Sequence, residues 1–376
     1  MSKRNNVLRI AALAAALPLA LAGCAANEGS TSTPESGAAG STDTAESSSS
    51  ISGTYGGAGA SSQEAAQAAW IAAFQTDNAD VTINYNPVGS GAGRKQFMEG
   101  AVAFAGSDSY LSDEELEGTF AACAADSKAR SLPVYISPIA VAFNLEGNDS
   151  LNLDADTIAR IFKGEITNWS DDAIVSLNPG ATLPDQAITV VYRSDDSGTT
   201  KNFAAYLGAN AGDVWDAKAE DKFPFSFAGA EGAQGTSGVV EAISTGTGTI
   251  GYADASKVSS LSTVALKVGE EFVPYSAEGA AKVVEVSPVV ENRHDGDVAI
   301  DLDRTTTESG AYPLVLVSYL LVCDTNKDEA TTEFIKAYVG YIASEAGQQA
   351  AAEGAGSAPL SAATRELVQA SIESIK

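Results

Sequence analysis

The sequence predicts an α/β protein with two domains, in which mostly parallel sheets are flanked by helices. Short alternating or β-branched runs recur along the chain, and amphipathic stretches with helical spacing separate them. Strands that alternate with helices in this way are typical of layered α/β folds. The part expected to fold is about 320 residues long, enough for two domains with apolar cores.

The residue pattern places the elements along the chain in the following order. Strands are expected at 81–85, 101–107, 187–193, 248–254 and 312–322. Helical spacing of apolar residues predicts helices over 63–75 and 331–348. In sheets of this kind, ligands bind at the carboxyl ends of strands, where loops lead into helix N-termini.

The N-terminus carries the pattern of an export signal. Three basic residues, Lys3, Arg4 and Arg9, precede an apolar run over 10–22 that is too short to span a bilayer. The run ends at Leu21-Ala22-Gly23-Cys24, which resembles a bacterial lipobox. We expect residues 1–23 to be a lipoprotein signal peptide and Cys24 to be lipidated, for example with palmitate, at the outer face of the cell membrane. The alternative is an ordinary secretory signal with an incidental cysteine.

Residues 24–52 are expected to form a disordered tether that begins with the lipidated cysteine. The stretch after Cys24 is nearly all Ser, Thr, Gly, Ala, Glu and Asp and holds no aromatic residue, so it cannot bury enough apolar surface to fold. Removal of the signal peptide changes the formal net charge from −27 to −30. Such an acidic chain makes nucleic acid or an anionic membrane surface a poor partner.

With Cys24 assigned to lipid, Cys123 and Cys323 remain, an even number that predicts a disulfide in an exported protein. The sequence does not favour a metal site, since only two cysteines and the single histidine, His294, are available as ligands of these types. We expect His294 to be a solvated loop residue. No cofactor is predicted.

Three segments combine a glycine-rich turn, a hydroxyl side chain and a helix start. In the first, Ser61 and Glu64 form a capping-box pattern; in the second, Ser90 stands at the expected N-cap; in the third, residues 197–199 (Ser-Gly-Thr) start a helix. A helix start offers unpaired N–H groups and a partial positive charge, so three converging starts predict a small-oxyanion site. Each segment taken alone is better explained as a simple helix cap, so the prediction rests on the three together.

One arginine and two aspartates complete this pattern. Arg193 adds a full positive charge with a fork suited to two oxygens. Asp108 follows a strand directly, and a carboxylate that faces an oxyanion is repulsive unless the ligand supplies a proton. Monohydrogen phosphate carries such a proton and sulfate does not, so the pattern favours phosphate. Asp195 is expected to hold the Arg193 guanidinium in place.

The ordered set of motifs resembles the phosphate-binding protein of bacterial phosphate ABC importers. The resemblance runs from about Gly53 to the C-terminus and rests on GGAGASSQ, GSGAGRKQF, FAGSDSYLSDEEL, IFKGEITNWSDDAIVSLNPGATLP, YRSDDSGTT and GTIGYAD. It implies a two-lobed periplasmic-binding-protein fold of type II (Venus-flytrap), with mixed sheets flanked by helices, that binds phosphate and delivers it to the membrane permease subunits of such an importer. It also implies a monomer without catalytic residues.

The resemblance implies which residues contact phosphate and where the lobes meet. The implied phosphate-binding residues are Ser61, Ser62, Ser90, Asp108, Arg193, Ser197, Gly198 and Thr199, with Asp195 orienting the arginine. Lobe one would be 53–138 plus 311–376 and lobe two 139–310, so a Cys123–Cys323 bridge would join the two pieces of lobe one. One departure is Ser61-Ser62-Gln63, where many members have Thr-Phe-Pro.

Three other functions compete with this prediction. A phosphoesterase is suggested by a serine near Arg and Asp, but Ser197 has no histidine or lysine base in its own motif. A receptor for another tetrahedral anion such as sulfate is opposed by the two aspartates. A surface adhesin role could coexist with binding.

Overall fold

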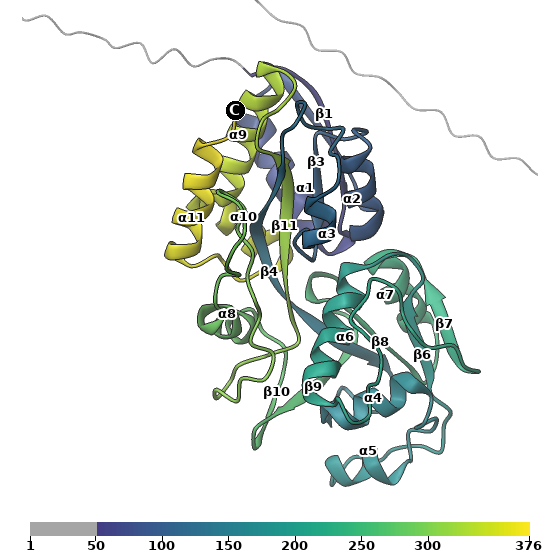
Figure 1. Cartoon of the computed structure of the whole chain (residues 1–376). Coiled ribbons are helices and arrows are strands. Elements are labelled where there is room, and N and C mark those ends of the chain that lie inside the picture. The colour runs from purple at the N-terminus through teal and green to yellow at the C-terminus, as the bar shows by residue number, and fades with distance from the viewer. Residues whose placement is uncertain (1–50) are drawn as a thin grey trace, which may run out of the picture. The chain divides into compact units, whose positions relative to one another are not determined.

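One 16-residue strand, β4 (Ala129–Asn144), organises the fold because it belongs to two sheets in turn (Figure 1). Its first part pairs with β11 (Val315–Cys323) as far as Pro138, and its second part pairs with β8 (Thr249–Asp254) from Ile139 onward. We call the strands along the first part the first sheet and those along the second part the second sheet.

The computed structural model describes residues 51–376. The predicted signal peptide (1–23), Cys24 and all but the last two residues of the predicted tether (24–52) therefore lie outside the described residues.

The first sheet has the strand order β2-β1-β3-β11-β4. Its β1 pairs in parallel with both neighbours, whereas β11 runs antiparallel to β3 and β4. The remaining strands are β1 (Gly53–Gly59), β2 (Val81–Asn86) and β3 (Phe104–Ser107). Helices cover one face with α1 (Glu64–Asp77), α9 (Glu329–Ala343), α10 (Glu345–Ala355) and α11 (Ala362–Glu373), and the other with α2 (Ser90–Met98), α3 (Asp113–Leu116) and α8 (Ala277–Val286).

The second sheet continues through β4-β8-β6-β7, in which β6 is parallel to both neighbours. A further strand, β9, pairs with β4, β5 and β10. These strands are β5 (Ser150–Leu153), β6 (Thr189–Arg193), β7 (Ala230–Ala233), β9 (Ser262–Val268) and β10 (Glu271–Val273). The helices α4 (Ala155–Lys163), α5 (Asp172–Leu177) and α6 (Gly198–Asn210) pack into one core, α7 (Gly235–Thr245) packs into another, and the turn η2 (Ala255–Lys257) follows β8.

The predicted α/β fold with mixed sheets is confirmed. Every expected strand coincides with an observed one (β2, β3, β6, β8 and β11), and both sheets combine parallel and antiparallel pairs. The prediction of mostly parallel sheets is wrong for the central pair of strands, since β4 and β11 run antiparallel. The stretch 331–348 forms two helices rather than one, because Ser344 ends α9 and caps α10 by accepting a hydrogen bond from the Gly347 N–H at 3.1 Å.

The strand partner of β4 changes beside one of the predicted lobe boundaries. The change falls at 138/139, where the predicted ranges 53–138 and 139–310 meet. The segment 277–302, which the predicted boundary near 310 assigns to lobe two, packs against the first sheet. In this segment Val283 shares a core with Ile136, and the Val298 N–H donates to the Ser131 carbonyl at 2.9 Å. The predicted lobe boundary near 310 stays a prediction.

The cysteines and the histidine lie away from the carboxyl ends of the parallel strands. Cys123 and Cys323 form a disulfide that joins two segments 200 residues apart in the first sheet region. The expectation of a solvated His294 is wrong: its side chain is 15% exposed, with Nε2 3.5 Å from Asp324 and Nδ1 3.7 Å from Asp297. The imidazole therefore lies between two carboxylates rather than in open solvent.

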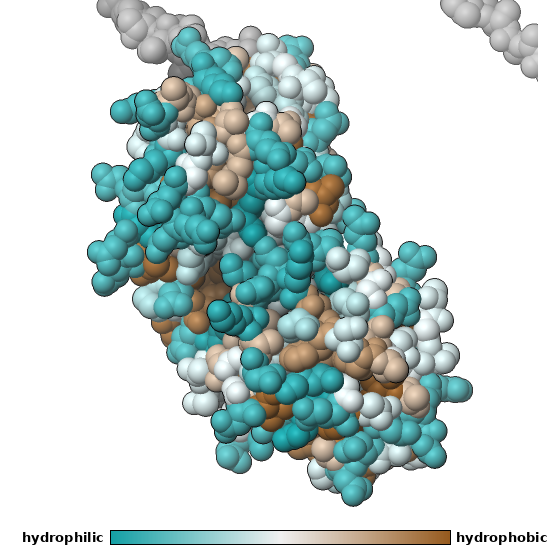
Figure 2. All heavy atoms as spheres, turned by 45° about the vertical axis from the view of Figure 1, so that its right-hand side comes forward, coloured by the Kyte–Doolittle hydropathy of each residue, from teal (hydrophilic) through white to brown (hydrophobic). Residues whose placement is uncertain are grey.

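Hydrophilic residues predominate on the face seen in Figure 2, and apolar residues form separate patches there. Among the described residues, the exposed large apolar side chains are Val175, Val286, Val289 and Leu367. Within residues 51–376, none of the helices combines the length and apolar character needed to cross a bilayer.

Candidate oxyanion site between the two sheets

The predicted site residues lie together where the first sheet faces the second. From the first sheet come the turn η1 (Ser61–Gln63), the start of α2 and the residue after β3; from the second come the end of β6 and the start of α6. All eight predicted ligand residues are buried: Ser61, Ser62, Ser90, Asp108, Arg193, Ser197, Gly198 and Thr199. Asp195 lies half-buried beside them.

Asp108 is the centre of this arrangement and is 3% exposed. Its Oδ1 accepts hydrogen bonds from Ser62 Oγ at 2.5 Å and from Ser318 Oγ at 2.6 Å, and its Oδ2 accepts one from Thr199 Oγ1 at 2.9 Å. Asn202 Nδ2 donates to the Asp108 carbonyl at 2.7 Å. Residues of both sheets therefore contact one buried carboxylate.

Burial raises the pKa of Asp108, since a carboxylate loses hydration in the interior. The hydrogen bonds from Ser318, Ser62 and Thr199 and the positive charge of Arg193 oppose that rise. The net pKa still lies above the ordinary aspartate value.

Ser61 and Ser90 do not cap their helices as predicted. Ser61 Oγ lies 3.0 Å from Thr236 Oγ1 and accepts from the Thr236 N–H at 3.0 Å, so its hydroxyl bonds across to the start of α7 rather than to its own helix. Ser90 is the first residue of α2, and its Oγ accepts from the Asp108 N–H at 3.1 Å. The N-cap is Gly89, whose φ of 99° suits glycine.

Ser197 fulfils the predicted capping role at α6, where its side chain accepts from the Thr200 N–H at 3.2 Å. The next residue must be small. A Cβ at Gly198 would lie 2.6 Å from Ser90 Oγ and 2.7 Å from Asp108 Cβ, distances that real contacts do not show. Glycine therefore permits the start of α6 to approach the residues of the first sheet.

Arg193 ends β6 and is held by Asp195. Its Nε donates to Asp195 Oδ1 at 2.7 Å and its Nη2 to Asp195 Oδ2 at 2.5 Å. Asp195 also accepts from the Gly235 N–H at 3.0 Å, which ties the pair to the start of α7. Burial alone would raise the pKa of Asp195, but the hydrogen bonds and charge of Arg193 outweigh it and hold the pKa below its usual range. The other edge of the guanidinium, at Nη1, lies 3.5 Å from Thr199 Oγ1.

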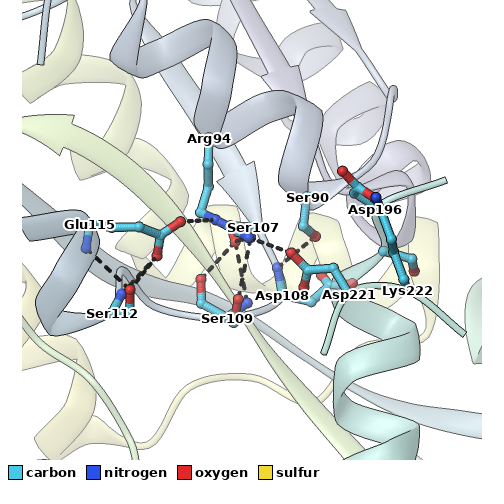
Figure 3. Close-up of polar contacts among 12 residues, drawn as sticks. Ser90, Arg94, Ser107, Asp108, Ser109, Ser112, Glu115, Asp196, Asp221 and Lys222 are labelled. Carbon is cyan, nitrogen blue, oxygen red and sulfur yellow. Dashed lines mark hydrogen bonds and ion pairs between the residues drawn. The ribbon is translucent and has the colours of Figure 1, made fainter. Parts of the chain in front are cut away.

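A second polar network links the sheets beside the site (Figure 3). Arg94 on α2 donates to Glu115 at 2.7 Å and forms an ion pair with Asp221, which lies in the loop after α6. The Asp221 carbonyl accepts from the Ser197 N–H at 2.8 Å. The N-cap of α6 is therefore connected through Asp221 to a helix of the first sheet.

Three residues that contribute to the site were not predicted from the sequence. Thr236 follows Gly235 at the start of α7, so the segment QGTSG repeats the pattern of glycine turn, hydroxyl and helix start that predicted the other segments. Ser318 is a hydroxyl inside the apolar run 312–322, a visible exception in that strand. Arg94 lies within the motif GSGAGRKQF, but nothing local indicates its partner 127 residues away.

Chemically, the arrangement offers many hydrogen-bond donors and one buried acceptor. Hydroxyls, helix-start N–H groups and one guanidinium can surround a small oxyanion. When Asp108 is ionised, its carboxylate can accept hydrogen bonds but cannot donate them. It therefore suits a ligand that still carries a proton.

Comparison with known proteins shows several matches over most of the chain. A family model described as a PBP superfamily domain matches residues 44–346. The phosphate-binding protein PstS 3 of Mycobacterium leprae is 34% identical over 294 residues, covering 76% of this chain and 78% of the relative.

Two solved structures share the fold. A high-affinity periplasmic phosphate-binding protein, PfluDING, solved with bound phosphate, is similar with a TM-score of 0.67 and 24% identity, covering 85% of this chain and 93% of that one. An ABC-type phosphate transport receptor from Vibrio cholerae is similar with a TM-score of 0.52 and 20% identity, covering 80% and 97%.

Proposed function

Because the chain belongs to the PstS phosphate-binding proteins of the PBP superfamily, we propose that it binds inorganic phosphate outside the cytoplasm and delivers it to an ABC-type phosphate permease. The observation that carries this proposal is the meeting of Asp108, Arg193 and the start of α6 in one buried place. Membership of the family and the site geometry support the same ligand independently.

In the proposed complex, Arg193 is the cation that neutralises phosphate. Asp195 occupies one edge of its guanidinium, so the Nη1 edge is oriented toward Thr199 and the ligand. The N–H groups of η1 and of α2 and α6, with the hydroxyls of Ser62 and Thr199, supply further donors.

Asp108 is proposed to distinguish phosphate from sulfate. An ionised carboxylate accepts the proton of monohydrogen phosphate, whereas fully ionised sulfate would place two anions together without a shared hydrogen. The alternative of a sulfate receptor is disfavoured by this buried acceptor, which no sulfate oxygen can satisfy.

The contacts of Ser197 support binding rather than ester hydrolysis. Its Oγ caps α6, and the single histidine of the sequence, His294, contacts Asp297 and Asp324 instead of this serine. A serine nucleophile needs an adjacent base to be activated. We therefore propose a receptor without a catalytic role.

The proposal extends to how the protein is held at the membrane. The basic, apolar and lipobox-like residues before Cys24 support lipidation of this cysteine and attachment to the outer face of the cell membrane. The receptor is proposed to act as a monomer that meets the permease while tethered through residues 24–52.

Isothermal titration calorimetry of the full chain with phosphate tests the proposal. Arg193→Ala is expected to weaken phosphate binding at least about hundredfold, because it removes a charge-assisted contact and leaves the Asp195 carboxylate without its cationic partner. Arg160→Ala is the matched control, since Arg160 pairs with Glu165 on the exposed surface. Absence of phosphate binding by the unaltered protein would refute the function; equal binding by Arg193→Ala would refute the site.

A further inference from the structure

Ser318 is a buried hydroxyl in β11, whose sequence VLVSYLLVC is otherwise apolar apart from one tyrosine. Its side chain is inaccessible to solvent. A hydroxyl in such a place is costly unless it is hydrogen bonded. The register between β11 and β4 shifts at Ser318/Tyr319, an irregularity of the kind that redirects side chains in a sheet. Here Ser318 Oγ reaches Asp108 Oδ1 at 2.6 Å.

The direction of this hydrogen bond is fixed by Gln63. Gln63 Nε2 donates to the Tyr319 carbonyl at 3.0 Å and to Ser318 Oγ at 2.7 Å. A carbonyl can only accept, so the amide must present its NH₂ group to this pair. Ser318 Oγ therefore receives a proton from Gln63, and its own single proton is directed to Asp108.

The same direction continues behind Gln63. Its Oε1 accepts from Gln67 Nε2 at 2.9 Å, and Gln67 Oε1 accepts from the Tyr338 hydroxyl at 2.8 Å. Gln63, Gln67 and Tyr338 are all buried, with at most 1% exposure. A chain in which each group donates toward the next strengthens its members, and this chain ends on the Asp108 carboxylate.

Ser318 differs from the other two hydroxyls that contact Asp108. Ser62 and Thr199 belong to segments that the proposed function assigns to phosphate, so their protons can turn to the ligand. Ser318 is held from behind by Gln63 and lies in the strand rather than in a binding turn. It remains a donor to Asp108 whether or not the neighbouring hydroxyls do.

We propose that Ser318, oriented by Gln63, is a specificity-determining residue that keeps Asp108 an acceptor for the proton of phosphate and thereby excludes sulfate. This inference rests on the proposed function. The Gln63 of this chain stands in the Ser61-Ser62-Gln63 turn, so the turn serves the acceptor as well as the ligand.

Other charged and titratable groups act on Asp108 from the surrounding elements. Arg193 on β6 favours the ionised form of Asp108, and burial together with the negative charge of Asp108 raises the pKa of Asp254 on β8 and of Tyr85 on β2. Burial raises the pKa of Asp108, and the Ser318 hydrogen bond opposes this rise. Loss of that bond should therefore raise the pKa of Asp108 further.

The test is calorimetric titration of the full chain with phosphate and with sulfate between pH 5 and pH 8. We call the pH range over which phosphate affinity falls toward acid the acidic limb. In Ser318→Ala, the acidic limb should move up by about one pH unit, and the phosphate-to-sulfate affinity ratio at pH 5 should fall about tenfold. The titration of phosphate itself is common to both proteins. Ser318→Thr keeps the hydroxyl and should restore the original limb.

Ser131→Ala is the matched control, because Ser131 is a fully buried hydroxyl of β4 that accepts from the Leu111 N–H and does not touch Asp108. It should leave both the limb and the ratio unchanged. An acidic limb and a ratio in Ser318→Ala equal to those of the unaltered protein would overturn the inference.

Carbon NMR of the Asp108 carboxyl without added anion separates the two claims. A higher pKa in Ser318→Ala supports the role of the hydrogen bond, and an unchanged pKa overturns it. If the unaltered protein bound no phosphate, the proposed function and the specificity role would both fall, whatever the NMR result.

Discussion

Replacement of Asp254 with asparagine should stabilise the protein at neutral and alkaline pH but not in acid. Asp254 ends β8, pairs with Ile139 where β4 passes between the sheets, and is inaccessible to solvent. Its Oδ1 accepts from the Tyr135 hydroxyl and the Ser256 N–H, both at 3.0 Å. Its Oδ2 is buried without a hydrogen-bond partner among the described residues.

The magnitude follows from the ionisation of this carboxyl group. Burial raises the pKa of Asp254 to about 6 from an ordinary value of 3.8. The folded state therefore holds the proton more tightly than the unfolded state does. The contribution of Asp254 to stability is greatest below the unfolded pKa and is lost as the pH rises through the folded one. A difference of about two pH units corresponds to about 3 kcal/mol.

Asparagine keeps the shape and the Oδ1 acceptor but cannot ionise. The difference in unfolding free energy between Asp254→Asn and the unaltered protein should therefore grow in favour of the variant by about 3 kcal/mol from about pH 3 to about pH 8. Urea denaturation followed by tryptophan fluorescence at several pH values measures it. A difference that does not change with pH would refute the reasoning.

Three further predictions concern the disulfide, the acceptor and the link between sheets. Replacing Cys123 and Cys323 with alanine opens a link across 200 residues and should lower the unfolding free energy by about 5 kcal/mol in urea denaturation; a loss under about 1 kcal/mol would contradict the loop-entropy argument. Asp108→Asn puts a donor where the acceptor stood and should reduce the preference for phosphate over sulfate at least tenfold in competition titrations, whereas an unchanged preference would exclude the proton-acceptor role. Arg94→Met removes the ion pair with Asp221 and should make phosphate dissociate about tenfold faster in stopped-flow experiments, and an unaltered dissociation rate would show that this pair does not hold the site.

Local patterns in the sequence predicted the parts of the site that local structure determines. Ser197 caps α6 as its motif indicates, and Asp108 follows β3 as the strand pattern predicts. The predicted capping box at Ser61 does not form, because the Ser61 hydroxyl bonds to Thr236, 175 residues away, at a helix start that was not among the predicted segments. Ser318 lies 210 residues from Asp108, and the contact depends on how two strands pair. Partners at such separations are set by the tertiary fold, so no local period or motif reveals them.

Some of the predicted ligand residues followed only from the resemblance to phosphate-binding proteins, because no periodic pattern marks them. Ser62, for example, shows no pattern of its own, yet its hydroxyl contacts the carboxylate of Asp108 at 2.5 Å. The position of α8 could not be predicted from the sequence, because its packing against the first sheet depends on apolar contacts with residues far away in the sequence.

A crystal structure of the protein grown with inorganic phosphate tests the central claim most directly. The account predicts phosphate between η1 and the starts of α2 and α6, with Arg193 donating to it and one of its oxygens within hydrogen-bond distance of the Asp108 carboxylate. Phosphate bound elsewhere, or bound without contact to Asp108, would contradict the account.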